Sequence, residues 1–165
     1  DKAPWYEHTE IGYNYRMSNI LAAIGRGQML HLEERIDRRR AIYKKYKQEL
    51  EKIPGIKLMS ETPKSRSIQW LTAITIDREI TGKTFMDVLS YMNEQNIETR
   101  PVWKPMHLQP YFKERNSKYF THGEGANGSV SDKLFNTGIC LPSASAMTDE
   151  EQDYVIKTVK EAITR

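Results

Sequence analysis

Four side chains close together in the sequence could bind a phosphorylated sugar or a nucleotide: Arg100, Trp103, Lys104 and His107. A tryptophan can stack on the face of a sugar or base, and arginine and lysine can contact a diphosphate. A histidine can form hydrogen bonds in either protonation state. Structural roles compete with these interpretations, because Trp103 could fill a seam between domains, Lys104 could be solvated and His107 could only fix the loop.

The stretch that holds most of these side chains, residues 103–128, is irregular and is interrupted by Pro105, Pro110, Gly123, Gly125 and Gly128. A long loop in a compact domain is more often functional than accidental, so this stretch is the first candidate region for a site. The sequence has no glycine-rich phosphate loop, no paired cysteines for zinc and no Gly-x-Ser-x-Gly motif. No metal is expected, since the remaining histidines lack a second ligand at metal-binding spacing: His8, His31 and His122.

Composition is that of a folded domain: the chain has 165 residues, 38% hydrophobic and 28% charged. The net charge of +3 includes 22 acidic residues, so nucleic acid is not an expected partner. No run is long and apolar enough to span a bilayer, and a single cysteine, Cys140, excludes an internal disulfide. We therefore expect a cytoplasmic protein without a membrane partner. The chain begins with Asp-Lys-Ala-Pro-Trp-Tyr rather than Met, which suggests part of a longer polypeptide.

One long helix, with a bend allowed, is predicted for residues 18–53, where apolar residues recur at three- or four-residue steps and Pro54-Gly55 forms a stop signal. Gly25 and Gly27 lie inside this helix, and a close packing contact would explain them. The helix also carries a basic stripe, formed by Arg35, Arg38, Arg39, Arg40, Lys44, Lys45 and Lys47. Acidic residues are interspersed with it, which favours a solvated helix face over a nucleic-acid surface.

Strands are predicted at residues 56–59, 68–76 and 138–141, with a short extended piece at 97–102. Helices are predicted after Thr84, weakly over residues 129–137, and after the capping box that Thr148 begins. This order predicts an α/β (α+β) fold in which a long lead-in helix precedes three or four short strands covered by helices on one side.

Two segments resemble the DegT/DnrJ/EryC1/StrS family of sugar aminotransferases, which belong to fold-type I of the pyridoxal-phosphate enzymes. The first runs Ile11-Gly-Tyr-Asn-Tyr-Arg-Met-Ser-Asn-Ile-Leu-Ala-Ala-Ile-Gly25 and is followed by Gln28. The second runs Arg100-Pro-Val-Trp-Lys-Pro-Met-His-Leu-Gln-Pro-Tyr-Phe112. The ending around Gly138–Ser143 and Thr148–Glu151 is also similar, so the resemblance covers essentially the whole chain.

The resemblance implies that the chain is the carboxy-terminal part of an enzyme roughly twice its size. Residues 1–17 would be the remnant of the large cofactor domain, residues 18–53 a connecting helix, and residues 54–165 the small carboxy-terminal α/β domain. The Schiff-base lysine would lie outside the chain, so no catalytic residue is assigned here. By itself the chain is expected to be inactive and not to bind pyridoxal phosphate.

By the same resemblance, the whole enzyme is a homodimer that takes an amino group, usually from glutamate, and gives it to the keto carbon of a nucleotide-linked sugar. Asn14 would reach the cofactor phosphate of the neighbouring subunit, where its amide can donate two hydrogen bonds without adding charge. Arg16 would lie near the substrate, where its fork suits a diphosphate or carboxylate. Without the resemblance, Asn14 is a turn residue and Arg16 a surface ion pair.

Many family members carry a His-Tyr pair where this chain has Pro101 and Val102, which puts the usual sugar contacts in doubt. The form Arg-Pro-x-Trp-Lys-Pro-Met-His looks most like the branch that makes 4-amino sugars from UDP-linked 4-keto-6-deoxy-N-acetylglucosamine, in the bacillosamine-type pathway. Two other interpretations stay open. One is a lysine-less member of the same family that acts as a sugar dehydratase or regulator, and the other is a non-catalytic basic binding module.

Overall fold

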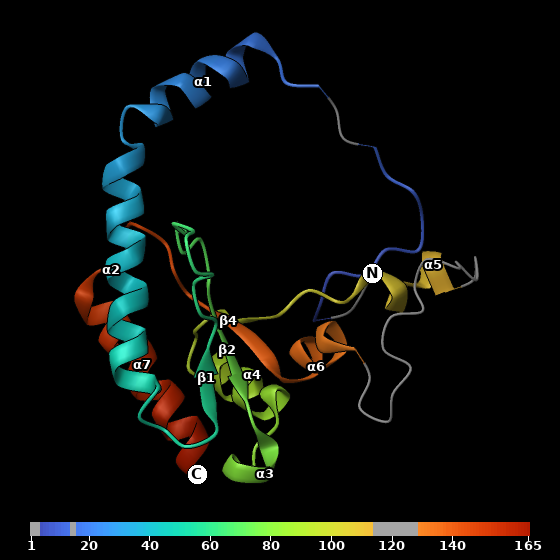
Figure 1. The fold of residues 1–165 in the computed structure, drawn as a ribbon, viewed down its shortest axis with the longest axis vertical. Coiled ribbons are helices and arrows are strands. Elements are labelled where there is room, and N and C mark those ends of the chain that lie inside the picture. The colour runs from blue at the N-terminus through green and yellow to red at the C-terminus, as the bar shows by residue number, and fades with distance from the viewer. Residues whose placement is uncertain (1–3, 14–15, 114–128) are drawn as a thin grey trace.

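In the computed structural model of this protein, residues 4–13, 16–113 and 129–165 are described. Figure 1 shows a small sheet at the centre, with α2 and α7 side by side along it and α1 reaching away from the body. The elements in chain order are α1 (Asn19–Met29), α2 (Leu32–Leu50), β1 (Ile56–Leu58), β2 (Thr72–Ile76), α3 (Arg78–Thr81), α4 (Phe85–Glu94), β3 (Arg100–Pro101), a 3-10 helix (Met106–Leu108), α5 (Pro110–Lys113), α6 (Val130–Thr137), β4 (Gly138–Leu141) and α7 (Asp149–Thr164).

The described strands form one antiparallel sheet in the order β1-β2-β4-β3. In its centre Thr72 of β2 lies opposite Leu141 of β4, and Ile74 lies opposite Ile139. The short strand β3 pairs with the outer side of β4 and places Pro101 opposite Ile139. The predicted sheet of three or four short strands is confirmed, and β4 has the predicted bounds.

The hydrophobic core lies between one face of this sheet and helices α2, α4 and α7. Successive strand residues point to opposite faces, so Ile139 and Leu141 enter the core while Cys140 points to the other side. The fully buried side chains of the core come from both layers: Tyr46, Ile42, Leu50, Ile74, Ile76, Met92, Ile139, Leu141, Val88 and Val159. This arrangement confirms the predicted fold class.

Local capping signals explain where most helices begin. The side chains of Thr84, Ser129 and Thr148 each accept a hydrogen bond from the backbone N–H three residues later, and the carboxylate at that later position accepts one from the backbone N–H of the cap residue. These reciprocal bonds satisfy helix N–H groups that have no partner within the helix. Ser18 caps α1 in the simpler way, through the backbone N–H of Leu21.

The helix predicted over residues 18–53 is divided into two helices that meet at an angle (Figure 1). The N–H groups of Leu30 and His31 bond to the carbonyls of Gly27 and Gln28, which is a tighter turn than an α-helix allows. Among the described residues none packs against Gly25 or Gly27 within 4 Å, and α1 buries no side chain. The described residues therefore supply no partner for the predicted close contact, which stays a prediction.

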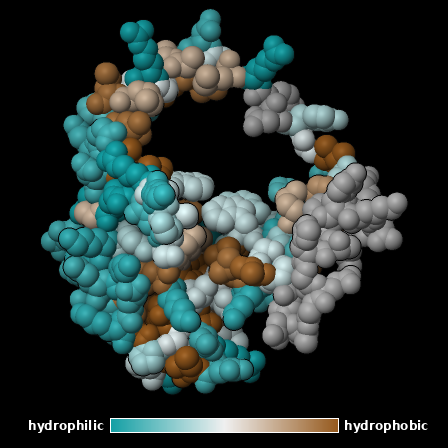
Figure 2. All heavy atoms as spheres, viewed as in Figure 1, coloured by the Kyte–Doolittle hydropathy of each residue, from teal (hydrophilic) through white to brown (hydrophobic). Residues whose placement is uncertain are grey.

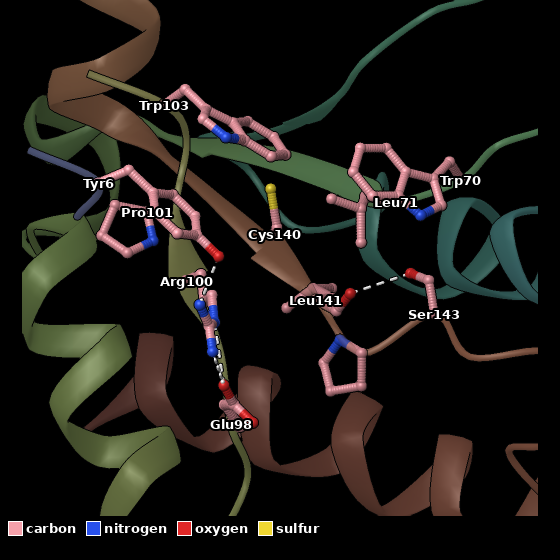
Figure 3. A pocket seen from close by; sticks show the side chains of 11 residues that line it. Tyr6, Trp70, Leu71, Glu98, Arg100, Pro101, Trp103, Cys140, Leu141 and Ser143 are labelled. Carbon is pink, nitrogen blue, oxygen red and sulfur yellow. Dashed lines mark hydrogen bonds and ion pairs between the residues drawn. The ribbon is translucent and has the colours of Figure 1, made fainter. Parts of the chain in front are cut away.

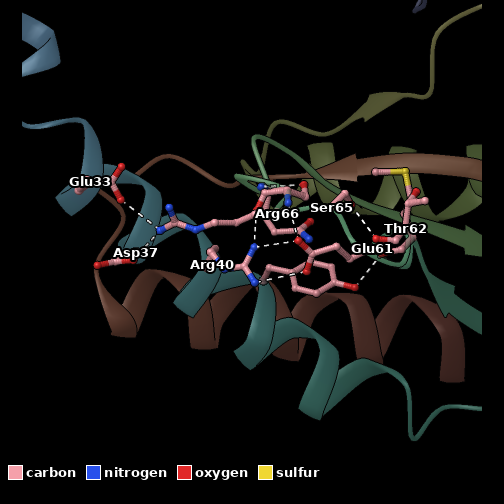
Figure 4. Close-up of polar contacts among 11 residues, drawn as sticks. Glu33, Asp37, Arg40, Glu61, Thr62, Ser65 and Arg66 are labelled. Carbon is pink, nitrogen blue, oxygen red and sulfur yellow. Dashed lines mark hydrogen bonds and ion pairs between the residues drawn. The ribbon is translucent and has the colours of Figure 1, made fainter.

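Part of the basic stripe of α2 holds neighbouring segments, while Arg35, Lys44 and Lys47 are exposed, as expected for a solvated face. Arg38 donates to Asp149 of α7 at 2.9 Å, and Arg40 donates to Glu61 at 3.1 Å and to the carbonyl of Ser67. Arg66 reaches back from the β1–β2 connection to Glu33 at 3.1 Å (Figure 4). The bonds of Arg40 and Arg66 fasten the long β1–β2 connection to α2, and the bond of Arg38 joins α2 to α7.

Other parts of the outward side of α2 remain hydrophilic, as Figure 2 shows, while hydrophobic residues appear towards the middle of the body. Among the helices of the described residues, none combines the length and apolar character needed to cross a membrane.

Candidate aromatic ligand site

The amino-terminal segment, residues 4–8, packs against the loop that follows β3, and we call it the strap. Gln109 joins the two, since its Nε2 donates to the carbonyl of Tyr6 at 3.0 Å and its Oε1 accepts from the backbone N–H of His8 at 3.2 Å. Gln109 is buried, so both of its amide atoms are used for this contact in a largely dry environment. The strap is therefore held on the domain surface by hydrogen bonds to a buried side chain.

Lys104 secures the strap through a short ion pair with Glu7. Its ammonium group also lies over the ring of Trp5, 5.6 Å from the centroid, and the indole N–H of Trp5 donates to Glu7 at 2.9 Å. Trp5 in turn meets Phe135 of α6 edge to face, at 5.6 Å between centroids. Lys104 is thus mostly buried in this cluster, so it is neither solvated nor exposed for a diphosphate.

Acid should release the strap, because hydrogen bonds from Lys104 and then from Trp5 lower the pKa of Glu7. A carboxylate whose pKa is lowered in the folded state stabilises the folded state at pH values above its ordinary pKa of 4.5. This stabilisation is lost as the pH falls through the lowered pKa. We expect tryptophan fluorescence to change in this acidic range before the far-ultraviolet circular dichroism does. The Glu7→Gln variant should lose the transition and Glu10→Gln should keep it; an unaltered transition in Glu7→Gln would contradict this assignment.

Beside the strap lies a pocket of about 260 Å³, which we call the aromatic pocket. Tyr6 and Trp103 stack nearly parallel, with 6.5 Å between ring centroids and 12° between planes, and Trp70 leans over Trp103 at 6.0 Å. Figure 3 shows the Cys140 sulfur pointing into the space between these rings from the sheet below. The remaining lining residues are Leu71, Glu98, Arg100, Pro101, Leu141, Pro142 and Ser143.

Arg100 forms the polar end of the aromatic pocket. Its Nε and Nη2 donate to Glu98 Oε1 at 2.9 and 2.6 Å, and its Nη1 donates to the hydroxyl of Tyr6 at 2.7 Å. The hydrogen bond to Glu98, with the nearby Tyr6 and Glu98 groups, raises the pKa of Arg100, so the guanidinium stays charged. The side chain is more than half exposed, which leaves it accessible from solvent.

His107 is used in a contact between the loop and α6. Its Nε2 lies 2.7 Å from Asp132 Oδ1, and both side chains are mostly buried. Desolvation raises the pKa of Asp132, but hydrogen bonds from Ser129 and His107 outweigh it, and the net shift is downward. The contact therefore joins the 3-10 helix to the capping box of α6.

The sequence candidates are only partly brought together. Arg100 and Trp103 line one pocket, whereas Lys104 and His107 flank it in internal pairs. Arg16 is exposed just before α1 and is not part of the pocket lining. Asn14 lies outside the described residues.

Sequence reasoning did not single out Tyr6, Trp70 or Glu98 as site residues. Trp70 stands just before β2 and Tyr6 in the strap, so no local pattern places either beside Trp103. The available signal was the chain's small set of tryptophans, Trp5, Trp70 and Trp103, all of which take part in the strap and the aromatic pocket.

The aromatic pocket has the chemistry of a binding site more than of a reaction centre. Burial raises the pKa of Cys140, which keeps its thiol protonated and weakly nucleophilic. No group of three or more His, Cys, Asp or Glu side chains within residues 4–13, 16–113 and 129–165 is arranged to hold a metal ion. What the pocket offers is stacking surface with one guanidinium at its edge.

The fold resembles those of solved structures that include aminotransferases and a dehydratase. It matches DesV from S. venezuelae with a TM-score of 0.75 at 24% identity, over 97% of this chain and 40% of that one. It also matches the E. coli GDP-4-keto-6-deoxy-D-mannose-3-dehydratase with bound hydrated PLP, with a TM-score of 0.73 at 21% identity, over 90% of this chain and 36% of that one.

The chain belongs to the DegT/DnrJ/EryC1/StrS aminotransferase family, whose sequence profile matches residues 1–160. It is 43% identical over 159 residues to EpsN of Bacillus subtilis (strain 168), whose name assigns it provisionally to the pyridoxal phosphate-dependent aminotransferases. It is 30% identical over 156 residues to the GDP-perosamine synthase of Escherichia coli O157:H7. The matches cover 96% and 94% of this chain but 39% of each relative, so the chain spans about two fifths of their length.

Proposed function

We propose that this chain supplies the carboxy-terminal part of a pyridoxal-phosphate-dependent aminotransferase that aminates a nucleotide-linked keto-sugar, with glutamate as the amino donor. The observation that carries the proposal is the family match over residues 1–160, joined by relatives named for sugar amination. The share of each relative that is covered supports a longer parent protein that contains further parts.

In this proposal residues 1–17 belong to the large cofactor domain, residues 18–53 connect the domains, and residues 54–165 form the small domain. The Schiff-base lysine lies in the part of the parent protein beyond this chain. Lys104 is paired with Glu7 and is not available to the cofactor phosphate, which in this proposal is held mainly by residues beyond this chain.

The proposed roles of this chain concern the substrate and the neighbouring subunit. Asn14 donates its amide to the cofactor phosphate of the partner in a homodimer, and Arg16 lies on the substrate side of that motif. Arg100 and Trp103 contact the nucleotide sugar directly, since both line the aromatic pocket. Lys104 and His107 support substrate binding indirectly, because their ion pairs keep the strap and the loop in position.

For the substrate we propose UDP-linked 4-keto-6-deoxy-N-acetylglucosamine, the precursor of bacillosamine-type sugars. The support is the similarity of the segment Arg100–His107 to that branch of the family. The relatives include enzymes named for GDP-linked and UDP-linked sugars, so their names alone do not choose the nucleotide. A cytoplasmic location remains a prediction from the single cysteine.

A lysine-less dehydratase is the second candidate, favoured by the likeness of the fold to GDP-4-keto-6-deoxy-D-mannose-3-dehydratase. The non-catalytic basic module has less support, because arginines of α2 that would form its surface are bonded to neighbouring segments. The two enzymatic candidates differ at one position of the parent protein, lysine for amination and histidine for dehydration.

The test uses the full-length protein. We expect a cofactor absorbance band near the visible edge and transfer of the glutamate amino group to the UDP-linked keto-sugar, detected by mass spectrometry. Loss of the sugar's hydroxyl without gain of nitrogen would support the dehydratase. Absence of both the band and either product would refute the proposed function.

The interface role of Asn14 can be measured in the same protein. The Asn14→Ala variant loses up to two hydrogen bonds to a charged phosphate, so we expect the dissociation constant of the cofactor to rise about tenfold. The measurement is the cofactor dissociation constant, obtained from the absorbance band during dialysis. Asn19→Ala, at the first position of α1, is the control and should retain the cofactor normally; equal retention in both variants would exclude the assigned role.

A further inference from the structure

The aromatic pocket is too small to take a whole nucleotide sugar. Its volume of about 260 Å³ lies below the roughly 300–1,000 Å³ of sites that enclose complete small-molecule ligands. One ring system fits that space better than a diphosphate joined to two rings. The pocket therefore suits one end of a larger molecule whose remainder lies outside it.

We propose that this pocket binds the base of the substrate's nucleotide, with Arg100 facing the phosphate groups. The inference rests on the proposed function for the class of substrate, and it adds which moiety is recognised and by which residues. Trp70, Trp103 and Tyr6 supply the aromatic surface of the pocket. Trp70 and Tyr6 lie 6.0 and 6.5 Å from Trp103 between ring centroids, so a base stacks against this surface and not between Trp70 and Trp103.

The polar capacity of the lining decides between a base and a sugar. A sugar ring carries several hydroxyl groups, and each one that is buried without a partner is costly. The hydroxyl of Ser143 is already committed, because it donates to the carbonyl of Leu141 and accepts from the backbone N–H of Thr72, both at 2.9 Å. The charged groups of the lining, Glu98 and Arg100, stand together at one end, so a flat ring with few polar atoms fits the largely aromatic and apolar remainder.

The chemistry of the lining supports a stacking role. Every base can stack on an aromatic side chain through its flat face. Tyr6, Trp70 and Trp103 place three aromatic rings around the pocket.

The walls of the pocket are held in place before any ligand arrives. Arg39 of α2 donates to the carbonyls of Trp70 and Ser143, which lie on the pocket rim, and the second of these bonds is 3.2 Å long. Gln69 adopts a left-handed backbone conformation, with φ of 51°, directly before Trp70. Such a conformation is uncommon for a residue with a side chain, and it sets the direction in which Trp70 leaves the backbone.

Arg100 keeps hydrogen-bonding capacity for an anion. A guanidinium has five N–H groups, and the printed contacts to Glu98 and Tyr6 use its Nε, one bond of Nη2 and one of Nη1. Two N–H groups are left over from those contacts, and arginine is well suited to phosphate oxygens. Lys104 does not compete for this role, because Glu7 holds it.

The test measures binding of free UDP, GDP and TDP to the full-length protein by isothermal titration calorimetry. At least one of them should bind, and ribose 5-phosphate, which has no base, should bind much more weakly. The Trp70→Ala and Trp103→Ala variants should each weaken the preferred nucleotide by about 5- to 150-fold, the effect that loss of one base-stacking side chain has elsewhere. Trp103→Phe, which keeps an aromatic face, should restore most of the affinity.

Tyr154→Ala is the matched control, because Tyr154 is 47% exposed, as Trp103 is, but lies on α7, which packs on the opposite face of the sheet. It should bind the nucleotide normally. The inference is overturned if none of the three nucleotides binds, if ribose 5-phosphate binds as tightly as they do, or if both tryptophan variants bind like Tyr154→Ala. The proposed function is read separately, from the cofactor band and amination by the unsubstituted protein, so either idea can fail alone.

Discussion

Replacing Ile139 by alanine is expected to lower the free energy of unfolding by about 2–5 kcal/mol, the usual cost of truncating a buried isoleucine. Ile139 is fully buried in the central strand β4, where it lies opposite Ile74 of β2 and Pro101 of β3. Three strands and the helix layer meet at this point, so the surrounding side chains have little freedom to close the cavity. Urea denaturation of the chain, followed by circular dichroism, measures the change.

Ile20→Ala is the matched control, since Ile20 is 74% exposed on α1. Truncating Ile20 to alanine should change the free energy of unfolding of this chain by no more than about 0.5 kcal/mol. Equal effects at the two positions would show that the core does not centre on β4.

Replacing Gly138 by alanine should also destabilise the chain, by about 1–3 kcal/mol, because it places a methyl group where the backbone has no room. The added Cβ would lie 2.5 Å from the carbonyl oxygen of Leu134 and 2.6 Å from a methyl group of Val102. The first neighbour is backbone at the end of α6, so it can move only if α6 and β4 shift relative to each other. The loss should appear as a lower denaturation midpoint with an unchanged slope.

The Gly25→Ala variant is the comparison, because this substitution should not lower the free energy of unfolding. No neighbour lies within 4 Å of a Cβ at Gly25 among the described residues, and the position is inside α1. Alanine favours a helix over glycine by roughly 1 kcal/mol, so the helical content of α1 should increase and the chain should not be destabilised. A stabilised Gly138→Ala variant would contradict the packing described for that strand.

Sequence signals that act over a few residues predicted much of the fold. Thr84 and Thr148 mark helix starts because their side chains meet the backbone three residues later, a distance that needs no tertiary information. The strand at residues 138–141 was evident from its short apolar run. A bend in the long helix was allowed, but its position near Leu30 was not predicted; there the N–H groups of Leu30 and His31 bond to the carbonyls of Gly27 and Gln28.

The site was less predictable than the fold because its contacts join distant parts of the chain. Trp103 was a candidate, but its partners Tyr6 and Trp70 come from the strap and from the end of the β1–β2 connection. Lys104 appeared suited to phosphate, yet the structure pairs it with Glu7, far away in sequence. Family resemblance added Asn14, whose role remains a prediction.

Pro101 has a consequence for how this domain meets other chains. It occupies the edge strand β3, where Arg100 is aligned with Cys140 and the N–H of Val102 bonds to Gly138 on the inner side. In an antiparallel ladder the nitrogen of the residue between them faces outward, and in proline that nitrogen carries no hydrogen. A foreign strand docking along this border would lack a donor there, so the border that leads into the loop after β3 is protected against edge-to-edge aggregation.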